Sequence, residues 1–165
     1  METLTQEAFA DFGQVIDSES AQTSFLINGG TTQRFHDLAQ VEIQGEARGG
    51  ISIFRAQPRH FPFAISMLER HPYGSQAFMP LNQRPYLVVV APALDASQPD
   101  ISQLRLFKAS GTQGVNYALG TWHHPLICLE ETADFLVVDR VGQGQNCDEY
   151  HFTAADIKHI AELDF

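Results

Sequence analysis

The most constraining feature of this sequence is a succession of short apolar segments separated by closely spaced turn residues. Gly, Pro and Asn interrupt these segments along most of the chain, as in Asn28-Gly29-Gly30 and Gly49-Gly50. Many short strands with frequent turn signals are typical of an all-β sandwich or barrel. We therefore predict strands over these segments: Thr23–Asn28, Ala39–Ile43, Ile51–Ala56, Phe61–Leu68, Gln76–Leu81, Tyr86–Ala91, Leu104–Ala109, Gly114–Leu119, Pro125–Leu129 and Ala133–Asp139.

A short helix is predicted at each end of this β-structure. Thr5 can cap a helix over Gln6–Phe12, and Gly13 suits a left-handed C-terminal cap. Near the other end, Thr153 begins a capping-box pattern, and an apolar stripe follows over 157–161. The sequence thus predicts one β-domain with short N-terminal and C-terminal helices.

Length and charge narrow the possible partners. The 165 residues correspond to one ordinary domain, so we expect a single domain over residues 1–165. Twenty acidic and ten basic residues give a formal net charge of -10, which repels phosphate backbones and anionic membranes. We expect neither nucleic acid nor membrane as a partner, whereas a few local arginines could still bind a small anionic substrate. The first residues lack a secretory signal pattern and no apolar run could span a bilayer, so a soluble, cytoplasmic protein is expected.

One predicted strand changes from apolar to ionisable residues along a single face. On a continuous strand, that face carries every second residue: Phe63, Ile65, Met67, Glu69 and His71. A small barrel with an apolar floor and a polar mouth produces this pattern. The alternative is that the strand ends at Leu68 and that the ionisable residues belong to a solvated exit.

A second candidate is the segment Gly120-Thr121-Trp122-His123-His124-Pro125. Neighbouring side chains of an extended chain point to opposite sides, so at most one of His123 and His124 is expected to face a given cavity. Pro125 favours an extended backbone at His124. Neutral imidazole is a common metal ligand and a natural acid or base near neutral pH, although paired histidines also occur in surface loops.

Several arginines lie within or beside apolar strands. Arg34 precedes Phe35, Arg55 follows an apolar strand, and Arg140 follows another. The planar guanidinium group matches a carboxylate and rarely enters a core without a partner. These arginines therefore indicate anion binding, and the alternative for each is an ordinary ion pair with a neighbouring aspartate.

Several well-known site motifs are missing from the chain. The sequence contains no G-x-G-x-x-G, Walker, G-x-S-x-G or H-E-x-x-H pattern. Dinucleotide, kinase and serine-triad chemistry therefore have no support. The cysteines Cys128 and Cys147 have no paired spacing, which argues against a zinc ribbon or a disulfide framework.

Taken together, the order and spacing of several blocks resemble the ureidoglycolate lyase family, a cupin-type family once called ureidoglycolate hydrolase. The resemblance extends from the segment beginning at Leu4 to Asp148. It is carried by these blocks: Arg34-Phe35-His36-Asp37-Leu38-Ala39, Arg55-Ala56-Gln57-Pro58, Leu68-Glu69-Arg70-His71-Pro72, Ser75-Gln76-Ala77-Phe78-Met79-Pro80, Gly114-Val115-Asn116-Tyr117, Trp122-His123-His124-Pro125, Asp134-Phe135-Leu136 and Asp139-Arg140. The resemblance implies a cupin-like β-barrel or sandwich, that is, a double-stranded β-helix.

The general cupin pattern fits this sequence with two departures. Cupins commonly have His-x-His, then a Glu, then Gly-x-x-His, whereas this chain has Glu69-x-His71, then Gln76, then Gly120-x-x-His123. Two imidazoles, a carboxylate and an amide form a weaker ligand set than three histidines and a glutamate. The resemblance therefore leaves open whether a divalent metal, nickel or another, is bound at Glu69, His71, Gln76 and His123. It implies no organic cofactor.

The family resemblance implies cleavage of ureidoglycolate to glyoxylate and urea in the degradation of allantoin, a step of purine metabolism. For this reaction we assign Glu69, His71 and His123 to proton transfer or metal ligation. Candidates for binding the substrate are Arg34, Arg55 and Arg140 at its carboxylate, and Asn116, Tyr117 and His124 at its ureido group. Related cupins commonly pair through their sheets, so a homodimer is expected.

Two other functions remain open from the sequence. An amidohydrolase would release ammonia and carbon dioxide with glyoxylate, although that reaction usually needs a stronger metal site. A non-catalytic cupin would bind a small organic acid without turnover. The products formed from ureidoglycolate distinguish the three functions.

Overall fold

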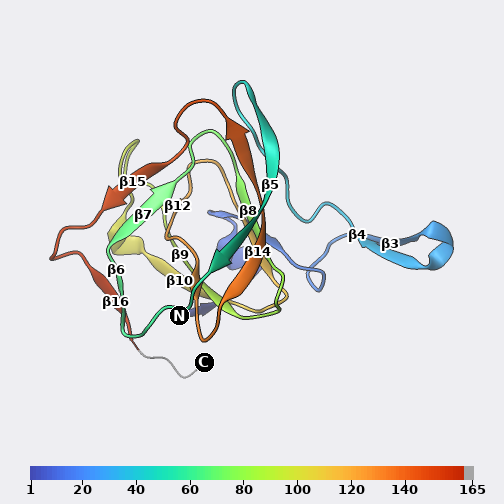
Figure 1. The fold of residues 1–165 in the computed structure, drawn as a ribbon, viewed down its shortest axis with the longest axis horizontal. Helices are drawn as coiled ribbons and strands as arrows, with labels where there is room; N and C mark the ends of the chain where they lie inside the picture. Colours follow the sequence, from blue (N-terminus) through green and yellow to red (C-terminus); the bar gives the residue numbers. More distant parts are fainter. Residues whose placement is uncertain (162–165) are drawn as a thin grey trace.

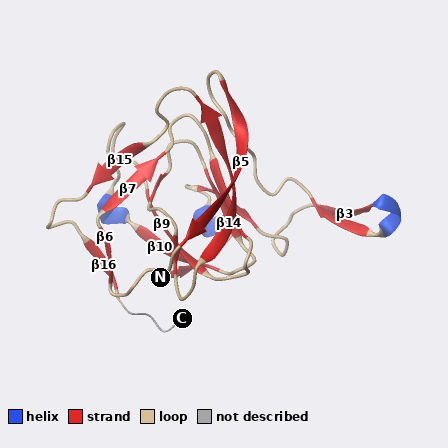
Figure 2. Cartoon of the chain, in the orientation of Figure 1, coloured by secondary structure: helices blue, strands red, loops and turns tan. Residues whose placement is uncertain are grey.

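The structure, a computed structural model, describes residues 1–161, and nearly all of its regular structure is β (Figures 1 and 2). Its elements in chain order are β1 (Glu2–Thr3), α1 (Gln6–Phe9), β2 (Gly13–Ile16), β3 (Ser24–Ile27), the 3-10 helix η1 (Asn28–Gly30), β4 (Thr32–Phe35), β5 (Ala47–Ala56), β6 (Phe63–Ile65), β7 (Met67–Arg70), β8 (Gln76–Pro80), β9 (Tyr86–Ala91), the 3-10 helix η2 (Ile101–Gln103), β10 (Arg105–Ala109), β11 (Gly114–Tyr117), β12 (Trp122–His123), β13 (Ile127–Cys128), β14 (Ala133–Gly142), β15 (Asp148–His151) and β16 (Lys158–Ile160).

Two larger sheets form the body of the molecule. Within residues 1–161, one sheet has the strand order β1-β10-β9-β12-β7-β15, with β13 also paired to β9, and the other has the order β2-β11-β8-β14-β5. The two sheets face one another across the interior (Figure 1). This arrangement confirms the predicted all-β, cupin-like sandwich.

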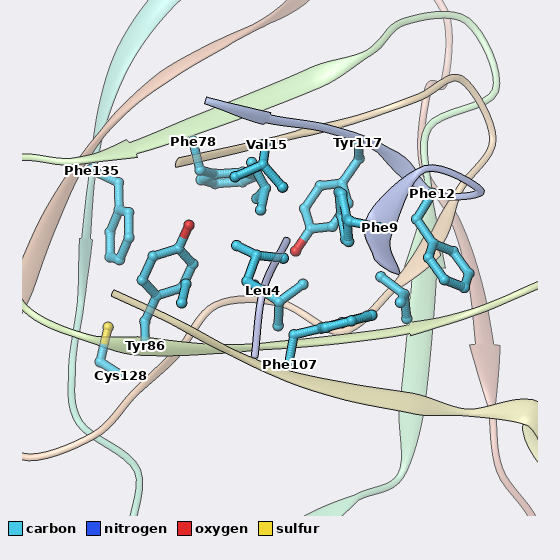
Figure 3. Close-up of a cluster of buried hydrophobic side chains, with 14 of the residues drawn as sticks. Leu4, Phe9, Phe12, Val15, Phe78, Tyr86, Phe107, Tyr117, Cys128 and Phe135 are labelled. Atoms are coloured by element: carbon cyan, nitrogen blue, oxygen red, sulfur yellow. The ribbon is translucent and has the colours of Figure 1, made fainter. Parts of the chain in front are cut away.

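The core between the sheets is rich in aromatic rings (Figure 3). Phe107 of β10 is fully buried, and the centroid of its ring lies 5.7 Å from that of Phe9 in an edge-to-face arrangement. Phe135 of β14 meets Tyr86 of β9 at 5.0 Å in the same way. Such contacts stabilise a pair beyond its buried area, so Phe135 and Tyr86 help to hold the two sheets together, and Phe9 and Phe107 hold α1 against β10.

A second core lies on the opposite face of the β9 sheet. The alternate residues Leu87, Val89 and Ala91 of β9 pack there with Ile65 and Trp122. The two-stranded sheet of β6 and β16 covers this face. As a result β9 is apolar along its whole length, which explains the uninterrupted apolar run at this point of the sequence.

The N-terminal helix is confirmed in a shorter form. The Thr5 hydroxyl accepts a hydrogen bond from the Ala8 backbone N–H at 3.1 Å, as a capping residue should, and the helix covers Gln6–Phe9. Gly13 starts β2 with φ of 144°, where a Cβ atom would lie 2.0 Å from the backbone oxygen of Asn116. The glycine is therefore required by close strand packing and not by a helix cap.

The predicted C-terminal helix is wrong. The Thr153 hydroxyl does bond Asp156 at 2.5 Å, but the chain makes only a turn there. Residues Lys158–Ile160 then pair with β6 as the strand β16, and Ile160 is buried in the second core. The local capping signal is present, and a tertiary strand partner overrides the helix that it predicts.

Two strand predictions also need correction. The segment 39–43 forms no regular strand, and Ile43 makes only an isolated bridge to Gly74. The predicted strand over 61–68 is divided at Ser66 into β6 and β7. Because of this break Ile65 and Leu68 both lie in the second core, and the predicted single alternating face does not exist.

We expect the Phe107→Ala substitution to lower the free energy of unfolding by about 3–5 kcal/mol, because it leaves a cavity in the aromatic core. Urea denaturation monitored by circular dichroism measures the change. Leu94→Ala is the control, since Leu94 is 62% exposed and its truncation should stay within about 0.5 kcal/mol of wild type. Equal stability of the two variants would contradict the assigned core.

Candidate active site

A cavity of about 490 Å³ opens between the two large sheets. One end carries polar and ionisable side chains and the remainder is largely apolar, which is typical of a small-molecule site. The lining residues are Phe54, Arg55, Ala56, Arg59, Glu69, His71, Gln76, Phe78, Tyr117, His123, His124, Pro125 and Leu126.

Glu69, His71 and His123 form the ionisable cluster of this cavity. Each offers one ligand atom, and these atoms all lie within 4.8 Å of one another. Glu69 of β7 and His123 of β12 are paired across neighbouring strands, and Glu69 Oε1 lies 3.6 Å from His123 Nε2. Sheet pairing therefore fixes two members of the cluster, Glu69 and His123.

The two histidines are held in a defined orientation by backbone carbonyl groups. His71 Nδ1 lies 2.6 Å from the Asn146 oxygen, and His123 Nδ1 lies 2.8 Å from the Thr121 oxygen. A carbonyl group can only accept, so in the neutral rings Nδ1 carries the proton and Nε2 keeps its lone pair. Both Nε2 atoms are buried and make no hydrogen bond among the described residues.

Aromatic stacking supports His123 further. The ring of Tyr117 lies 4.1 Å from the His123 ring at an angle of only 11°. Burial, with a smaller contribution from the charge of Glu69, raises the pKa of Tyr117 well above its ordinary value. The phenol therefore stays neutral and keeps its proton at physiological pH.

Gln76 completes the polar end of the cavity. Its Nε2 group donates to Asp139 Oδ2 at 3.3 Å, which leaves the buried Oε1 atom without a hydrogen-bond partner among residues 1–161. Buried polar atoms without partners are uncommon in folded proteins and point to an unbound ligand or a functional role.

The electrostatic environment of Glu69 combines two opposing effects. Burial raises the pKa of its carboxyl group, but the nearby imidazoles of His123, His71 and His124 outweigh burial and hold the pKa below its ordinary value. Glu69 is therefore ionised near neutral pH and can accept a proton or bind a cation.

The donor atoms of this cluster fit a divalent metal ion. Two imidazole nitrogens and a carboxylate suit first-row transition metals, and the amide oxygen of Gln76 is a further ligand. The unpartnered Nε2 atoms of His71 and His123 and the Oε1 atom of Gln76 are the observations that favour such an ion. Glu69 also lies within 4.8 Å of ligand atoms of Cys147 and Glu149, a second group that was not predicted.

Both histidines of the Trp122–Pro125 segment line the cavity, so the expectation that at most one faces it is wrong. His123 pairs with Val90 and Ile127 pairs with Leu87. The three residues between His123 and Ile127 therefore lie opposite only two residues of β9. The extra residue forms a bulge, and bulges redirect side chains near active sites. Burial lowers the pKa of His124, and its Nδ1 lies 2.7 Å from the Pro125 oxygen.

Of the three arginines predicted to bind the substrate carboxylate, one lines the cavity and two do not. Arg55 lines the cavity, but both of its bonded nitrogens contact the carboxylate of Asp134, at 2.7 and 2.9 Å. Arg34 lies on β4, outside the cavity. Arg140 donates to the backbone oxygens of Gln44 and Gln143.

Asn116 also lies outside the cavity. Its Nδ2 group donates to Gln14 Oε1 at 2.7 Å and to the Gln40 oxygen at 2.9 Å, on the other face of the sheet from Tyr117. The positions of Asn116 and Arg140 give no support to their predicted contact with substrate. Arg59, in contrast, lines the cavity and was missed. Arg59 lies three residues beyond the end of the predicted strand. Alternation along a strand therefore could not predict the direction of its side chain.

The fold and the cavity define a cupin-like β-sandwich with an enzyme-like polar cluster. The profile of the family described as Ureidoglycolate lyase matches residues 1–158. The chain therefore belongs to the ureidoglycolate lyase family. None of the helices within the described part of the chain is long and apolar enough to cross a membrane.

Relatives from three bacterial genera agree with this assignment. A protein of Burkholderia mallei named ureidoglycolate lyase is 57% identical over 150 residues, which cover 90% of this chain and 86% of that protein. Proteins of the same name from Brucella anthropi and Pseudomonas putida are 55% and 53% identical over 154 residues. These alignments cover 93% of this chain and 89% and 90% of the respective relatives.

We expect nuclear magnetic resonance of the imidazole nitrogens to detect His71, His123 and His124 with the proton on Nδ1 when their rings are neutral. Their Nδ1 atoms all face carbonyl oxygens. His151 is the control with the opposite tautomer, because its Nε2 lies 3.0 Å from a Glu149 carboxylate oxygen. A proton on Nε2 of His123 would contradict the orientation described here.

Proposed function

We propose that this protein is a lyase that cleaves ureidoglycolate to glyoxylate and urea. Support comes from the family assignment, from the names of relatives at 53–57% identity, and from the cluster of Glu69, His71 and His123 in a cavity of small-molecule size. The observation that carries most weight is the pair of uncommitted Nε2 atoms beside an ionised carboxylate.

The proposed reaction is the collapse of a carbinolamide. The hydroxyl group loses its proton and its oxygen forms the carbonyl group of glyoxylate, while the carbon–nitrogen bond breaks and its electron pair moves to nitrogen. The nitrogen must then receive a proton, because a urea anion is a poor leaving group. Atoms balance without water, an oxidant or a reductant.

We assign the proton transfers to Glu69, His71 and His123. The lone pair on His123 Nε2 accepts the hydroxyl proton. His123 Nε2 then gives this proton to the departing urea nitrogen, because the hydroxyl group and that nitrogen are bonded to one carbon atom of the substrate. Ionised Glu69, 3.6 Å away, stabilises the imidazolium formed between the two steps. His71 Nε2 is a second acceptor at the same end of the cavity.

A divalent metal, nickel or another, is a further part of the proposal. Glu69, His71, Gln76 and His123 would hold it, and when bound it supplies Lewis-acid polarisation that lowers the pKa of a hydroxyl group. With these side chains committed as ligands, His124 is the remaining imidazole of the cavity, and its pKa, lowered by burial, keeps it neutral and able to accept a proton.

The remaining side chains of the cavity bind the substrate in this proposal. Tyr117 and His124 contact the ureido group, and the phenol of Tyr117 donates to its oxygen. Arg55 or Arg59 at the cavity wall, or Arg34, binds the carboxylate, and a homodimer is the expected assembly. The cytoplasmic location remains a prediction from the sequence.

The test of this function is a product assay with racemic ureidoglycolate, in which glyoxylate, urea and ammonia are measured together and a blank without enzyme is subtracted. We expect urea equal to glyoxylate and no excess ammonia. His123→Ala should lower turnover by about a hundred- to ten-thousand-fold, the contribution of a general acid–base group. His151→Ala, a change of an exposed histidine outside the cavity, is the control.

Other outcomes favour the alternative functions. Ammonia in place of urea would assign the protein to the amidohydrolases. Binding of a small organic acid without turnover would indicate a non-catalytic cupin. A wild-type rate in His123→Ala would remove that residue from the mechanism.

We expect purified protein to carry a divalent ion, as determined by elemental analysis, and chelation to lower its activity until the ion is restored. His71→Ala should lose the ion, because it removes one of two imidazole ligands. His151→Ala should retain it. Full activity in protein shown to be free of metal would leave proton transfer to the side chains alone.

A further inference from the structure

The strands β3 and β4 form an arm that projects away from the two large sheets (Figures 1 and 2). Among the described residues these strands pair only with each other, and η1 joins them at the tip. Every residue of both strands is exposed or half-buried. A lone two-stranded hairpin is marginally stable in water, so this arm needs a surface to cover it.

The composition of the arm differs from that of the whole chain. Residues 23–36 contain no acidic residue, although the chain has twenty, and Arg34 is their one arginine. Leu26 is 65% exposed, and Phe25 and Phe35 are about 40% exposed. An arm without acidic residues can approach another acidic molecule without the repulsion that the rest of this surface produces.

The outward face of the β5–β14 pair has the matching character. We call the side chains Ile51, Ile53, Leu136 and Val138 the outer face. Ile51 and Ile53 of β5 are 76% and 56% exposed, and the cross-strand neighbours on β14 are half-buried. Arg55 beside them is neutralised by Asp134, and β5 is an edge strand of its sheet within residues 1–161. Such an exposed apolar edge normally has a partner.

The arm and the outer face belong to the same side of the molecule. The chain that leaves the arm is attached to this side, because Asn116 donates to the Gln40 oxygen at 2.9 Å and Glu42 donates to Ser75 Oγ at 2.9 Å. A two-fold axis that joins two outer faces therefore carries each arm across the partner. Each copy offers one arm and receives one, as an isologous interface requires.

This arrangement has a consequence for the cavity. Side chains alternate along β5, so Ile53 points outward while its neighbour Phe54 lines the cavity, and Arg55 stands at the cavity wall. An arm that lay on Ile53 of a partner would therefore contact the strand that also carries Phe54 and Arg55 of the cavity lining. Arg34 is available there, since its guanidinium lies over Phe25 at 5.9 Å and has no ion pair within the described residues.

We propose that the β3–β4 arm packs on the outer face of a second copy of this chain and that Arg34 binds the substrate carboxylate in the cavity of that second copy. The second part rests on the proposed function. Arg55 is engaged by Asp134, so a guanidinium supplied from outside completes the site. The competing ligand is Arg59, which lines the cavity of its own chain.

Analytical ultracentrifugation tests the interface without reference to activity. We expect wild-type protein to sediment as a dimer and Ile27→Asp to shift it toward monomer, because Ile27 lies on the same face of the arm as Arg34 and the substitution places a charge in the contact. Leu94→Asp is the matched control, since Leu94 is 62% exposed outside the arm and the outer face. A monomeric wild type, or a dimer unchanged by Ile27→Asp, overturns the proposal.

Subunit mixing tests the contribution of Arg34. Arg34→Ala alone should lower kcat/KM about 10- to 100-fold, which corresponds to a lost charge-assisted hydrogen bond. Refolding it in equal amounts with Glu69→Gln should restore activity at about a quarter of the sites, because half of the random dimers are mixed and each has one intact site. Glu69→Gln mixed with His123→Ala is the control, and it should restore nothing because both residues act in one chain.

The outcomes separate this proposal from the proposed function. No restoration in mixed dimers verified by mass spectrometry, or a wild-type rate for Arg34→Ala, overturns the role of Arg34. In that case, a large rise in KM for Arg59→Ala would assign the carboxylate to Arg59. Absence of any turnover by wild type defeats the proposed function and with it the role of Arg34, while the sedimentation result still decides the interface.

Discussion

The complete burial of β9 is the constraint on which the rest of the structure depends. Every residue from Tyr86 to Ala91 is buried, with alternate side chains in the two separate cores. Both faces of the β9 sheet must therefore be covered, one by the β14 sheet and the other by β6 and β16. The strands beside β9 are fixed as well, and one of them carries His123 opposite Val90. His123 of the proposed catalytic cluster is thus held beside the most deeply buried strand of the fold.

Much of this architecture could be predicted because its signals are local. The strands β8, β9 and β10 are largely apolar, bounded by turn residues, and lie within the predicted ranges, and β14 begins at the predicted residue and continues three residues further. The C-terminal helix could not be excluded locally, since Thr153 and Asp156 have capping-box spacing and their side chains do form a hydrogen bond. What decides the conformation of Lys158–Ile160 is pairing with β6, nearly one hundred residues earlier in the chain. Interactions of such long range leave no signal in a short window of sequence.

The candidate site was predicted in part, and the reasons for success and failure are physical. Glu69 and His71 were selected because they share parity on a strand, and they do line one cavity. The apolar residues predicted to share their face do not follow this alternation. The chain breaks at Ser66, so Ile65 and Leu68 point into the same core. The strand bulge after His123 likewise admits both histidines. Parity holds within an unbroken strand, and breaks and bulges are set by tertiary pairing.

The division between the groups proposed to react and the groups proposed to bind follows from the same architecture. Glu69 and His123 lie on paired neighbouring strands, and the Tyr117 ring stacks on His123, so their positions are fixed by two cores and a sheet. Guanidinium groups cannot occupy that interior without paired charges, and the two arginines that line the cavity, Arg55 and Arg59, lie near the end of β5 and just beyond it. A ligand for the substrate carboxylate must therefore come from the rim of the cavity. A rim can be shared between two copies, whereas a cluster built on β7 and β12 cannot.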